Sequence, residues 1–596
     1  MLKRLRNKMF AMGKTSIFVA LRNPVFKRLW IMSIISGCCV SAHDTAATWM
    51  MSKLSHSSFL ISLISTVASL PFFLFTLPAG ALADMVDRRR LLFVMNIWLG
   101  CAAGGLAILT ALHLLHPYLI LLSVFLIGIG FSFYAPAWSA VVPEVVSKEH
   151  LASAVTLGGL QLNIAGIVGP ALGGLALASL GAQVVFATNA VCFFLLLTAL
   201  TNWGPAYATP KMPFENFLDS LASAVRYVRY APGIQVILVR DVIFSLFIAV
   251  IPALLPVVGL RQLGLDSSKL GLLFTSMGIG AVAGAVVVIP WARARFSANT
   301  LTILANLLLA IVFLLMAFVR DPDLFMVVAA LAGVGWTLTA SELWVAGQRA
   351  MPSWARGRMN ATHMMVSQGG LALGGLIWGA VAAFVSLDFA LISAALFLLF
   401  SLSLAIPLSI DFTKRLNLDP APLTTQYHRF LHVPDPSDGP VIVIMVFEID
   451  AANRRLFLDL MREMRLIYLR NGAFSWRLDE DLEKAGRFRM EMMVSSWSEH
   501  LQQHERMTKN ELATWRKVWS LHSAREEPIV KHYLSVHREL LMRRPAPLDV
   551  ERPTQEESSR MGRDVQSPPY LWDRTLEAVE KRAQREDRNN SSGEVL

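Results

Sequence analysis

Several ionisable side chains lie inside long apolar stretches of this chain or at the start of one. Among them are His43, Asp44, Arg240, Asp241 and Glu342. A charge in an apolar environment is costly, so such a residue faces a polar cavity or a partner. Burial in a dry cavity raises the pKa of a carboxylic acid toward neutrality, which suits proton exchange. The residue types therefore favour proton binding at Asp44 and, in second place, at Glu342.

Each carboxylate also has a purely structural alternative. Asp44 could pair with the adjacent His43 or with backbone groups. Glu342 could lie near one membrane surface and pair with Arg349 or Arg358. Both alternatives stay open at the level of the sequence.

Arg240 and Asp241 open their apolar stretch, and the sequence favours a local ion pair between them. Aromatic residues share these stretches, which would suit a cavity for an aromatic or amphipathic small molecule. Anchoring at the membrane interface is the alternative, favoured for Trp49 and Trp344 near the ends of their stretches. The aromatic candidates are Trp49, Tyr134, Trp138, Phe244, Trp336 and Trp344.

The elements that carry these residues are twelve apolar stretches of about 20 residues or more, the length that crosses a bilayer. Lys and Arg number twenty in the N-terminal segment and the even-numbered connections, against four in the others. This bias predicts that both termini lie in the cytoplasm. The predicted spans are 29–51, 59–83, 91–112, 117–140, 152–180, 182–203, 235–259, 268–290, 299–319, 323–348, 358–384 and 387–410.

Composition divides the chain into a membrane part and a smaller soluble part. Of the 596 residues, 54% are apolar and only 16% are charged, against about a quarter in soluble proteins. The net charge of +11 is explained largely by the cytoplasmic bias of Lys and Arg, so we expect no nucleic-acid partner. No cleavable signal peptide is evident. The cysteines lie in apolar stretches without zinc-like spacing, and are interpreted as packing residues: Cys38, Cys39, Cys101 and Cys192.

A charged turn, GALADMVDRRR at 80–90, joins the second and third predicted spans. It resembles the loop between spans two and three of the major facilitator superfamily, Gly-x-Leu-x-Asp-Arg/Lys-x-Gly-Arg/Lys-Arg/Lys. Met85 and Asp87 depart from that pattern. The resemblance implies a conformational latch on the cytoplasmic face, formed by the matching residues Gly80, Leu82, Asp84, Arg88 and Arg89.

The fifth predicted span carries small residues next to a proline, which permits close helix contact and a bend. It resembles the Gly-Pro-x-x-Gly-Gly core of the signature of antiporter-type members of the same superfamily, although Thr156 and Ala165 replace two upstream glycines. The resemblance favours export over uptake, and a tight helix contact without bearing on direction is the alternative. The matching residues are Gly169, Pro170, Gly173 and Gly174.

The periodicity changes after a proline-rich linker. Strands are predicted at 441–449, 473–478, 487–495 and 529–536, and helices at 451–470 and 497–522. This βαββαβ order is the ferredoxin-like arrangement. The segment also resembles small dimeric α/β-barrel proteins such as antibiotic-biosynthesis monooxygenases, which leaves open an enzyme fused to a carrier.

His500 and His504 lie four residues apart on the second predicted helix of this domain, a spacing that could hold a metal. No third ligand is obvious, and a solvated surface pair is the favoured interpretation, so no metal site is predicted. Glycine patterns of a P-loop are not found, which disfavours ATP-driven transport.

Together these features resemble the transmembrane secretion effector branch of the major facilitator superfamily over roughly residues 20–540. That resemblance implies an all-α membrane protein of twelve helices in two six-helix halves, with a small α+β ferredoxin-like domain. The expected division is 1–28 (basic cytoplasmic segment), 29–203 (first half), 204–234 (linker), 235–410 (second half), 411–440 (linker), 441–540 (soluble domain) and 541–596 (disordered tail).

The expected function is secondary active transport, with proton-coupled export of a small organic molecule by alternating access. A siderophore, a drug and a metabolite all fit, and an importer of the same fold or a transporter fused to a monooxygenase-like domain are alternatives. We expect no enzymatic activity and no cofactor. The expected partners are the small-molecule substrate, protons, the lipid bilayer of the bacterial inner membrane and a second copy through the soluble domain.

Overall fold

The computed structural model describes residues 17–201, 225–411, 417–421 and 434–535 of the chain. Eleven of the described helices are long and apolar enough to cross a membrane, and the apolar part of α7, Ala182–Thr198, is shorter. Three predicted segments lie wholly or mostly outside the described residues: the basic segment 1–28, the linker 204–234 and the tail 541–596. The prediction of a helical membrane part is confirmed.

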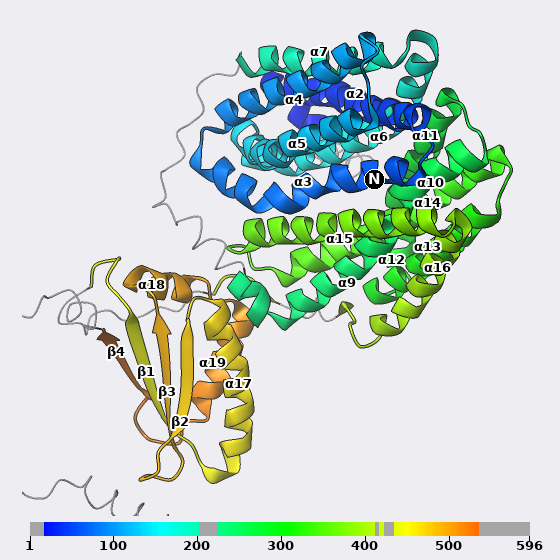
Figure 1. Ribbon diagram of the computed structural model, residues 1–596. Coiled ribbons are helices and arrows are strands. Elements are labelled where there is room, and N and C mark those ends of the chain that lie inside the picture. Colours follow the sequence, from blue (N-terminus) through cyan, green and yellow to red (C-terminus); the bar gives the residue numbers. More distant parts are fainter. Residues whose placement is uncertain (1–16, 202–224, 412–416, 422–433, 536–596) are drawn as a thin grey trace, which may run out of the picture. The chain divides into compact units, whose positions relative to one another are not determined.

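Helices α2 to α7 make up the first half, which is coloured blue to cyan in Figure 1. Their starts follow local signals, since Asn23 caps α2 by accepting hydrogen bonds from the N–H groups of Val25 and Phe26, and Pro24 occupies the first turn. A 3-10 helix, Ile17–Arg22, precedes them. The helices are α2 Pro24–Leu54, α3 Ser58–Met85, α4 Arg88–Ala111, α5 Pro117–Val145, α6 Leu151–Leu180 and α7 Ala182–Thr201.

The second half contains six spans, two of which are interrupted. The seventh span consists of α9 Pro232–Ile248, α10 Val250–Val257 and a π-helical turn, Val258–Gln262. The eighth consists of α11 Ser267–Ala283, a π-helical turn, Gly284–Val288, and α12 Ile289–Arg293. The others are α13 Ala298–Phe318, α14 Pro322–Ala350, α15 Arg356–Phe384 and α16 Leu387–Ser401, which continues as the 3-10 turn Leu402–Ala405.

The break between α9 and α10 has a local cause. Pro252 has no N–H to offer the carbonyl of Ile248, so the helical hydrogen-bond ladder cannot continue through this point. The residues of α10 are nevertheless buried in the core of the second half. The interruption therefore bends a buried span without exposing it.

The soluble part is a four-stranded antiparallel sheet of order β2-β3-β1-β4. Its strands are β1 Val441–Glu448, β2 Ser475–Glu480, β3 Arg487–Val494 and β4 Ile529–Leu534. Helices α17 Arg454–Arg470 and α19 Lys509–Ser520 cover one face of it (Figure 1). Alternate residues of β1 are buried against them, as the period-two pattern predicts. The βαββαβ order of the prediction is thus found.

One predicted helix of this sheet is divided in two. Instead of a continuous helix at 497–522, the chain forms α18 Trp497–Glu505 and α19, with Thr508 as the N-cap of α19. Thr508 and Glu511 form a capping box, in which each side chain accepts a hydrogen bond from the other residue's backbone N–H. This Thr-x-x-Glu signal was present in the sequence and contradicts the single predicted helix.

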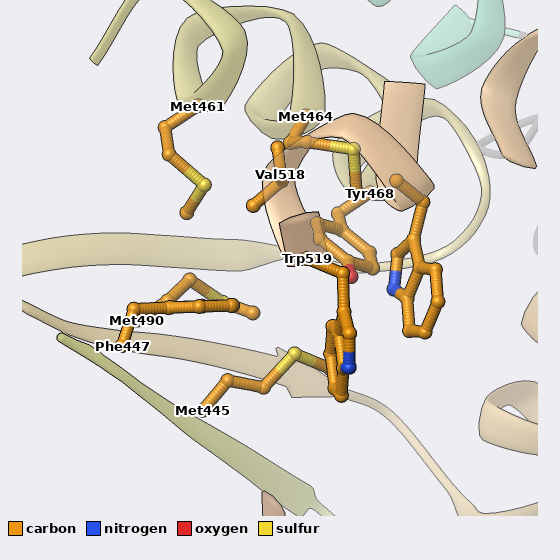
Figure 2. Close-up of a pocket in the computed structure, with 9 residues that line it drawn as sticks. Met445, Phe447, Met461, Met464, Tyr468, Met490, Val518 and Trp519 are labelled. Carbon is orange, nitrogen blue, oxygen red and sulfur yellow. The ribbon is translucent and has the colours of Figure 1, made fainter. Parts of the chain in front are cut away.

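The core between the sheet and its helices contains a small cavity (Figure 2). Figure 2 shows methionines and aromatic rings around it, with Trp519 and Tyr468 on the helix side and Phe447 and Met490 on the sheet. Its free volume is about 10 Å³, room for one water molecule. Flexible methionine side chains therefore fill this core almost completely.

Candidate functional site

The carboxylate of Asp44 is exposed on α2, whereas the four residues that follow it are buried. Asp44 lies ten residues before Leu54, about 15 Å along the helix. No hydrogen bond or ion pair joins its carboxylate to any described residue, and the hydroxyl of Thr48 donates to its backbone carbonyl. The structure thus contains an accessible carboxylate inside a membrane span.

The adjacent His43 does not pair with Asp44. Its ring is buried and packs against Phe186 of α7, with the ring centroids 4.7 Å apart. Neither ring nitrogen has a hydrogen-bond partner within the described chain. The alternative in which these two neighbours neutralise each other is therefore wrong for this structure.

Tyr134 and Trp138 stack on each other on α5, with the ring centroids 6.0 Å apart. Both pack against a small cluster that includes Leu29 at the start of α2. Leu29 precedes Asp44 by fifteen residues, about 22 Å along the same helix. The stacked pair and Asp44 therefore lie at different depths of the first half.

The aromatic candidates of the second half differ in their surroundings. Phe244 is buried in the core, so it does not line an open cavity. Trp336 is half-buried against the same core, and Trp49 of the first half also packs there. Trp344 is 43% exposed, and the edge of its ring meets the ring of His363. Trp336 is thus the partly accessible candidate of α14 that lies well inside its span.

Glu342 is buried on α14 and pairs with Arg293 at the end of α12, with Oε1 2.6 Å from Nε. This partner is neither Arg349 nor Arg358, so the predicted partners are wrong. The pair is possible because the π-helical turn before α12 carries the end of the eighth span toward α14. An ion-paired glutamate is a weaker candidate for proton exchange than the unpaired Asp44.

Arg240 and Asp241 do not form the predicted local pair. The guanidinium of Arg240 donates to Asn299 and Thr302 of α13, and to the carbonyl of Leu408. Successive residues of a helix point about 100° apart, so Asp241 faces a different neighbour. That neighbour is His363 of α15. Its place inside the predicted span 358–384 was the signal that could have found it.

The glycines of α6 make two different helix contacts. A Cβ atom on Gly173 would lie 2.6 Å from the Cα of Ala42, and one on Gly169 would lie 2.7 Å from the carbonyl oxygen of Cys38. Both contacts join α6 to α2 inside the first half. Gly174 instead meets α11 of the second half, where its Cβ would lie 2.7 Å from the carbonyl oxygen of Ser267. The prediction of close helix contact is confirmed.

The two halves meet mainly along two pairs of helices, with smaller contacts of α3 with α10 and of α2 with α11. Besides α6 with α11, α3 packs along α15, and these two run side by side in Figure 1. Glycines again permit this approach, because a Cβ on Gly375 would lie 2.6 Å from Oγ1 of Thr66. Arg261 adds a polar tie by donating to the carbonyls of Ser52 and Ser55 at the end of α2. Arg261 was counted in the sequence only as a loop charge.

The charged turn at 80–90 is described in part. The side chain of Asp84 is not among those described, so the ion pairs of the predicted latch stay a prediction. Gly80 has open space around the position of a Cβ. Asp87, which replaces the family's glycine, caps α4 by accepting from the N–H groups of Arg89 and Arg90. Such caps contribute about 1 kcal/mol of helix stability.

A comparison with protein families accounts for this architecture. Residues 15–540 match the family described as transmembrane secretion effector. The chain belongs to the transmembrane secretion effector family. It is a transmembrane transporter of the major facilitator type, as the helices and the resemblance predicted.

Relatives of this secretion effector include named exporters. The enterobactin exporter EntS of Citrobacter koseri is 26% identical over 372 residues, which cover 61% of this chain and 86% of the relative. EntS of Shigella boydii serotype 4 is 25% identical over 370 residues, with the same coverage of both chains.

Solved structures show the fold. The nucleoside transporter NupG has 13% sequence identity and a TM-score of 0.52, over 64% of this chain and 98% of that one. A bacterial homologue of the lysosomal transporter Spinster has 14% identity and a TM-score of 0.51, over 66% of this chain and 98% of its own. These proteins share an architecture with the secretion effector at low sequence identity.

The family match extends through the sheet, where a third histidine joins the predicted pair. The ring of His500 lies 4.5 Å from that of His504 and 5.0 Å from that of His532 on β4. His500 is fully buried, so its interpretation as a solvated surface residue is wrong. No group of three His, Cys, Asp or Glu side chains in the described ranges is arranged to hold a metal.

Burial lowers the pKa of all three imidazoles. The pKa of His500 falls to about 3 because of burial and then of the neighbouring His504 and His532. Burial, followed by the charge of His532, lowers the pKa of His504 to about 4, and burial also lowers the pKa of His532. The cluster is therefore uncharged at neutral pH.

Acid is expected to destabilise the sheet around this cluster. The unfolded chain takes up a proton near pH 6.5, whereas folded His500 does so only near pH 3. Stability is therefore complete above pH 6.5 and falls as the pH drops below it, by roughly 2 kcal/mol for His500 at about pH 5. Hydrogen exchange of residues 497–534 in the full-length protein, corrected for intrinsic rates, should show this loss of protection.

A variant of His500 isolates this contribution. His500→Phe keeps an aromatic ring in the core and removes the titrating group, so the loss of protection on acidification should shrink. His56, which is exposed in the connection between α2 and α3, is the site for a His→Phe control. An unchanged acid response in His500→Phe would contradict the assignment.

Proposed function

We propose that this secretion effector exports a small organic molecule across the bacterial inner membrane in exchange for protons, with both termini in the cytoplasm. Alternating access of a site between the two halves would carry the molecule. The coupling residue would be Asp44, and the small molecule would be of the siderophore, drug or metabolite type.

Asp44 is the observation that carries the proposal. Its carboxylate is accessible, lies inside a span and has no partner among the described residues. An unpaired carboxylate facing lipid would be costly, whereas one facing a water-filled cavity can load and release a proton. The latter fits a carrier whose midplane site opens to each side in turn.

The contacts between the halves support alternating access. The pairs Gly174–Ser267 and Thr66–Gly375, together with the tie from Arg261, lie toward the helix ends that the charge bias assigns to the periplasm. We therefore propose that this conformation is closed on the periplasmic side. Separation of these contacts would open the opposite state.

Inside-out membrane vesicles test the function and its direction. The probe is enterobactin, the molecule named for the EntS relatives. A pH difference of about one unit, acid inside, is worth about 1.4 kcal/mol per proton, so a one-for-one exchanger would accumulate the probe about tenfold. A protonophore should abolish this accumulation.

The same vesicles distinguish the importer. A proton symporter would move a preloaded probe out of vesicles that are acid inside, because proton and substrate would leave together. Net efflux driven by the gradient would therefore replace the export proposal with the importer. If transport of the probe depended neither on the gradient nor on the protonophore, the proposal of proton coupling would be wrong.

For the sheet domain we propose a non-enzymatic role. The cavity in its core has room for one water molecule and is lined by apolar and aromatic side chains, so it would not admit a substrate. The alternative is a monooxygenase-like activity of this domain. Substrate-dependent oxygen consumption by the full-length protein in detergent, lost on heat denaturation, would favour that alternative.

The face of the sheet that no described helix covers supports a homodimer. Ile442, Ile444 and Val446 of β1 are half-buried on this face, and Ile529 and Tyr533 of the neighbouring β4 are exposed. We propose that a second copy covers these side chains, since each copy presents the same apolar strand. Ile444→Lys should convert a dimer to a monomer by light scattering, whereas Arg477→Lys on the outer strand should not.

A further inference from the structure

A buried carboxylate and a buried imidazole face each other in the second half. Asp241 on α9 is 3% exposed and His363 on α15 is 5% exposed. Oδ2 of the carboxylate lies 3.7 Å from Nε2 of the ring, within reach of an ion pair. Both residues lie inside their spans, about 14 Å from the start of α9 and 10 Å from the start of α15.

The carboxylate oxygen of this pair accepts no hydrogen bond from any other described group. Oδ2 of Asp241 has no hydrogen-bond partner in the described chain, and the same holds for Nδ1 of His363. The neighbouring Arg240 cannot supply one, because its guanidinium is directed to Asn299 and Thr302 on the other side of α9. His363 is therefore the group that faces Asp241.

The surrounding helices contribute few other charges. On α14, Glu342 is occupied by Arg293, and the edge of the Trp344 ring meets His363. After α16, Asp411 accepts from the Ser297 hydroxyl and from the N–H of Asn299. Arg358 at the start of α15 has an interaction of its own. Among the described residues, Arg240 is adjacent to Asp241 in the chain, and its guanidinium is directed toward α13.

A buried carboxylate without hydrogen bonds is stable only when a proton neutralises it or a facing cation does. The pair can meet this condition in two ways: a neutral acid beside a neutral imidazole, or a carboxylate beside an imidazolium. Both forms contain one proton more than the fully deprotonated pair. The energetics thus require a proton somewhere between the two groups.

We propose that Asp241 and His363 together hold one exchangeable proton, as a second proton-binding site of the carrier in its second half. The role of this site in transport rests on the proposed proton coupling; the binding of the proton does not. The two residues titrate as a unit, since neither group is neutralised by anything else.

The position of the pair connects the proton to the contact between the halves. Gly370 and Gly374 bring α15 against Ser245 and Leu246 of α9, next to the pair. The same helix α15 packs along α3 of the first half. Loss of the proton would leave an unpaired buried carboxylate between α9 and α15, so it would weaken the attachment of the helix that forms the contact between the halves.

Infrared difference spectroscopy of the full-length protein in liposomes, between about pH 5 and pH 9, tests proton binding without a substrate. Besides the bands of its other ionisable groups, Asp44 among them, the wild type should show a titrating carboxylic acid or imidazolium band that belongs to the pair. In Asp241→Asn the lone buried imidazole stays neutral, and in His363→Gln the lone buried carboxyl keeps its proton. The titrating band should therefore vanish in both variants, which a structural role of either residue would not produce.

The control is Glu342→Gln, which removes a buried carboxylate that already has an arginine partner, and which should keep the band. Persistence of the band in either Asp241→Asn or His363→Gln would overturn the proposal. If the band maps to the pair but a pH gradient drives no flux, the proton site stands and proton-coupled transport fails. If the gradient drives flux and the band survives in both variants, proton-coupled transport stands and the proton site at Asp241 and His363 fails. Retained elution volume and tryptophan fluorescence identify variants that fold.

Discussion

Asp44→Asn is expected to abolish accumulation of enterobactin in inside-out vesicles that are acid inside. Asparagine matches aspartate in size but cannot bind or release a proton at this position. Under a gradient of about one pH unit, accumulation should fall from about tenfold to none. The measurement is the ratio of probe inside to outside at steady state.

Two variants control for simple damage to the protein. Asp44→Glu keeps the carboxylate and should retain gradient-driven accumulation. Asp388→Asn removes a carboxylate that is already bound by Gln262 and Arg320 near the end of a span, and it should behave like the wild type. If the Asp44→Asn variant accumulated enterobactin as fully as the wild type, Asp44 would not be the proton-coupling residue.

Gly174→Leu is expected to stop transport by separating α6 from α11. The first added carbon would already lie 2.7 Å from the carbonyl oxygen of Ser267 and 3.0 Å from the Cα of Gly271, both of them backbone atoms. Overpacking of this kind costs about 1–3 kcal/mol, which shifts a two-state equilibrium roughly 5–150-fold. The conformation in which these helices touch should be depopulated by that factor.

Labelling of a buried cysteine measures this shift. Ser62 is fully buried where α3 meets α15, so Ser62→Cys, in a background without the four native cysteines, should react slowly with a membrane-impermeant maleimide. Adding Gly174→Leu should accelerate labelling. Gly159 is exposed on the same helix with nothing within 4 Å of its Cβ position, so Gly159→Leu is the matched control. Equal labelling rates in both variants would show that Gly174→Leu does not separate α6 from α11.

Most of the architecture could be predicted because the signals for it are local. A span is recognised by its own apolar length, and the described helices lie within a few residues of the predicted ones. Strands β1 and β3 alternate in burial in the same way, whereas β2 and β4 do not. The division between α18 and α19 was missed although it is also local, since the capping box at Thr508 was not read.

Partners of buried side chains could not be predicted in this way. The sequence favoured a local pair of Arg240 with Asp241, and left open His43 or backbone groups as partners of Asp44 and Arg349 or Arg358 as partners of Glu342. Adjacent helical residues diverge by about 100°, so a side chain inside a span meets another helix rather than the next residue. Glu342 meets Arg293 and Asp241 meets His363, at sequence separations of 49 and 122 residues.

The sequence by itself determined that this chain has a membrane part of helices, a bias of positive charge to one side and a small α/β domain, because hydropathy, charge bias and strand periodicity act over short stretches. The tertiary structure alone decided which buried charges are neutralised, which glycines join the two halves, and that His532 completes a buried cluster with His500. These features depend on which distant segments are packed together, and no single stretch of the chain contains that information.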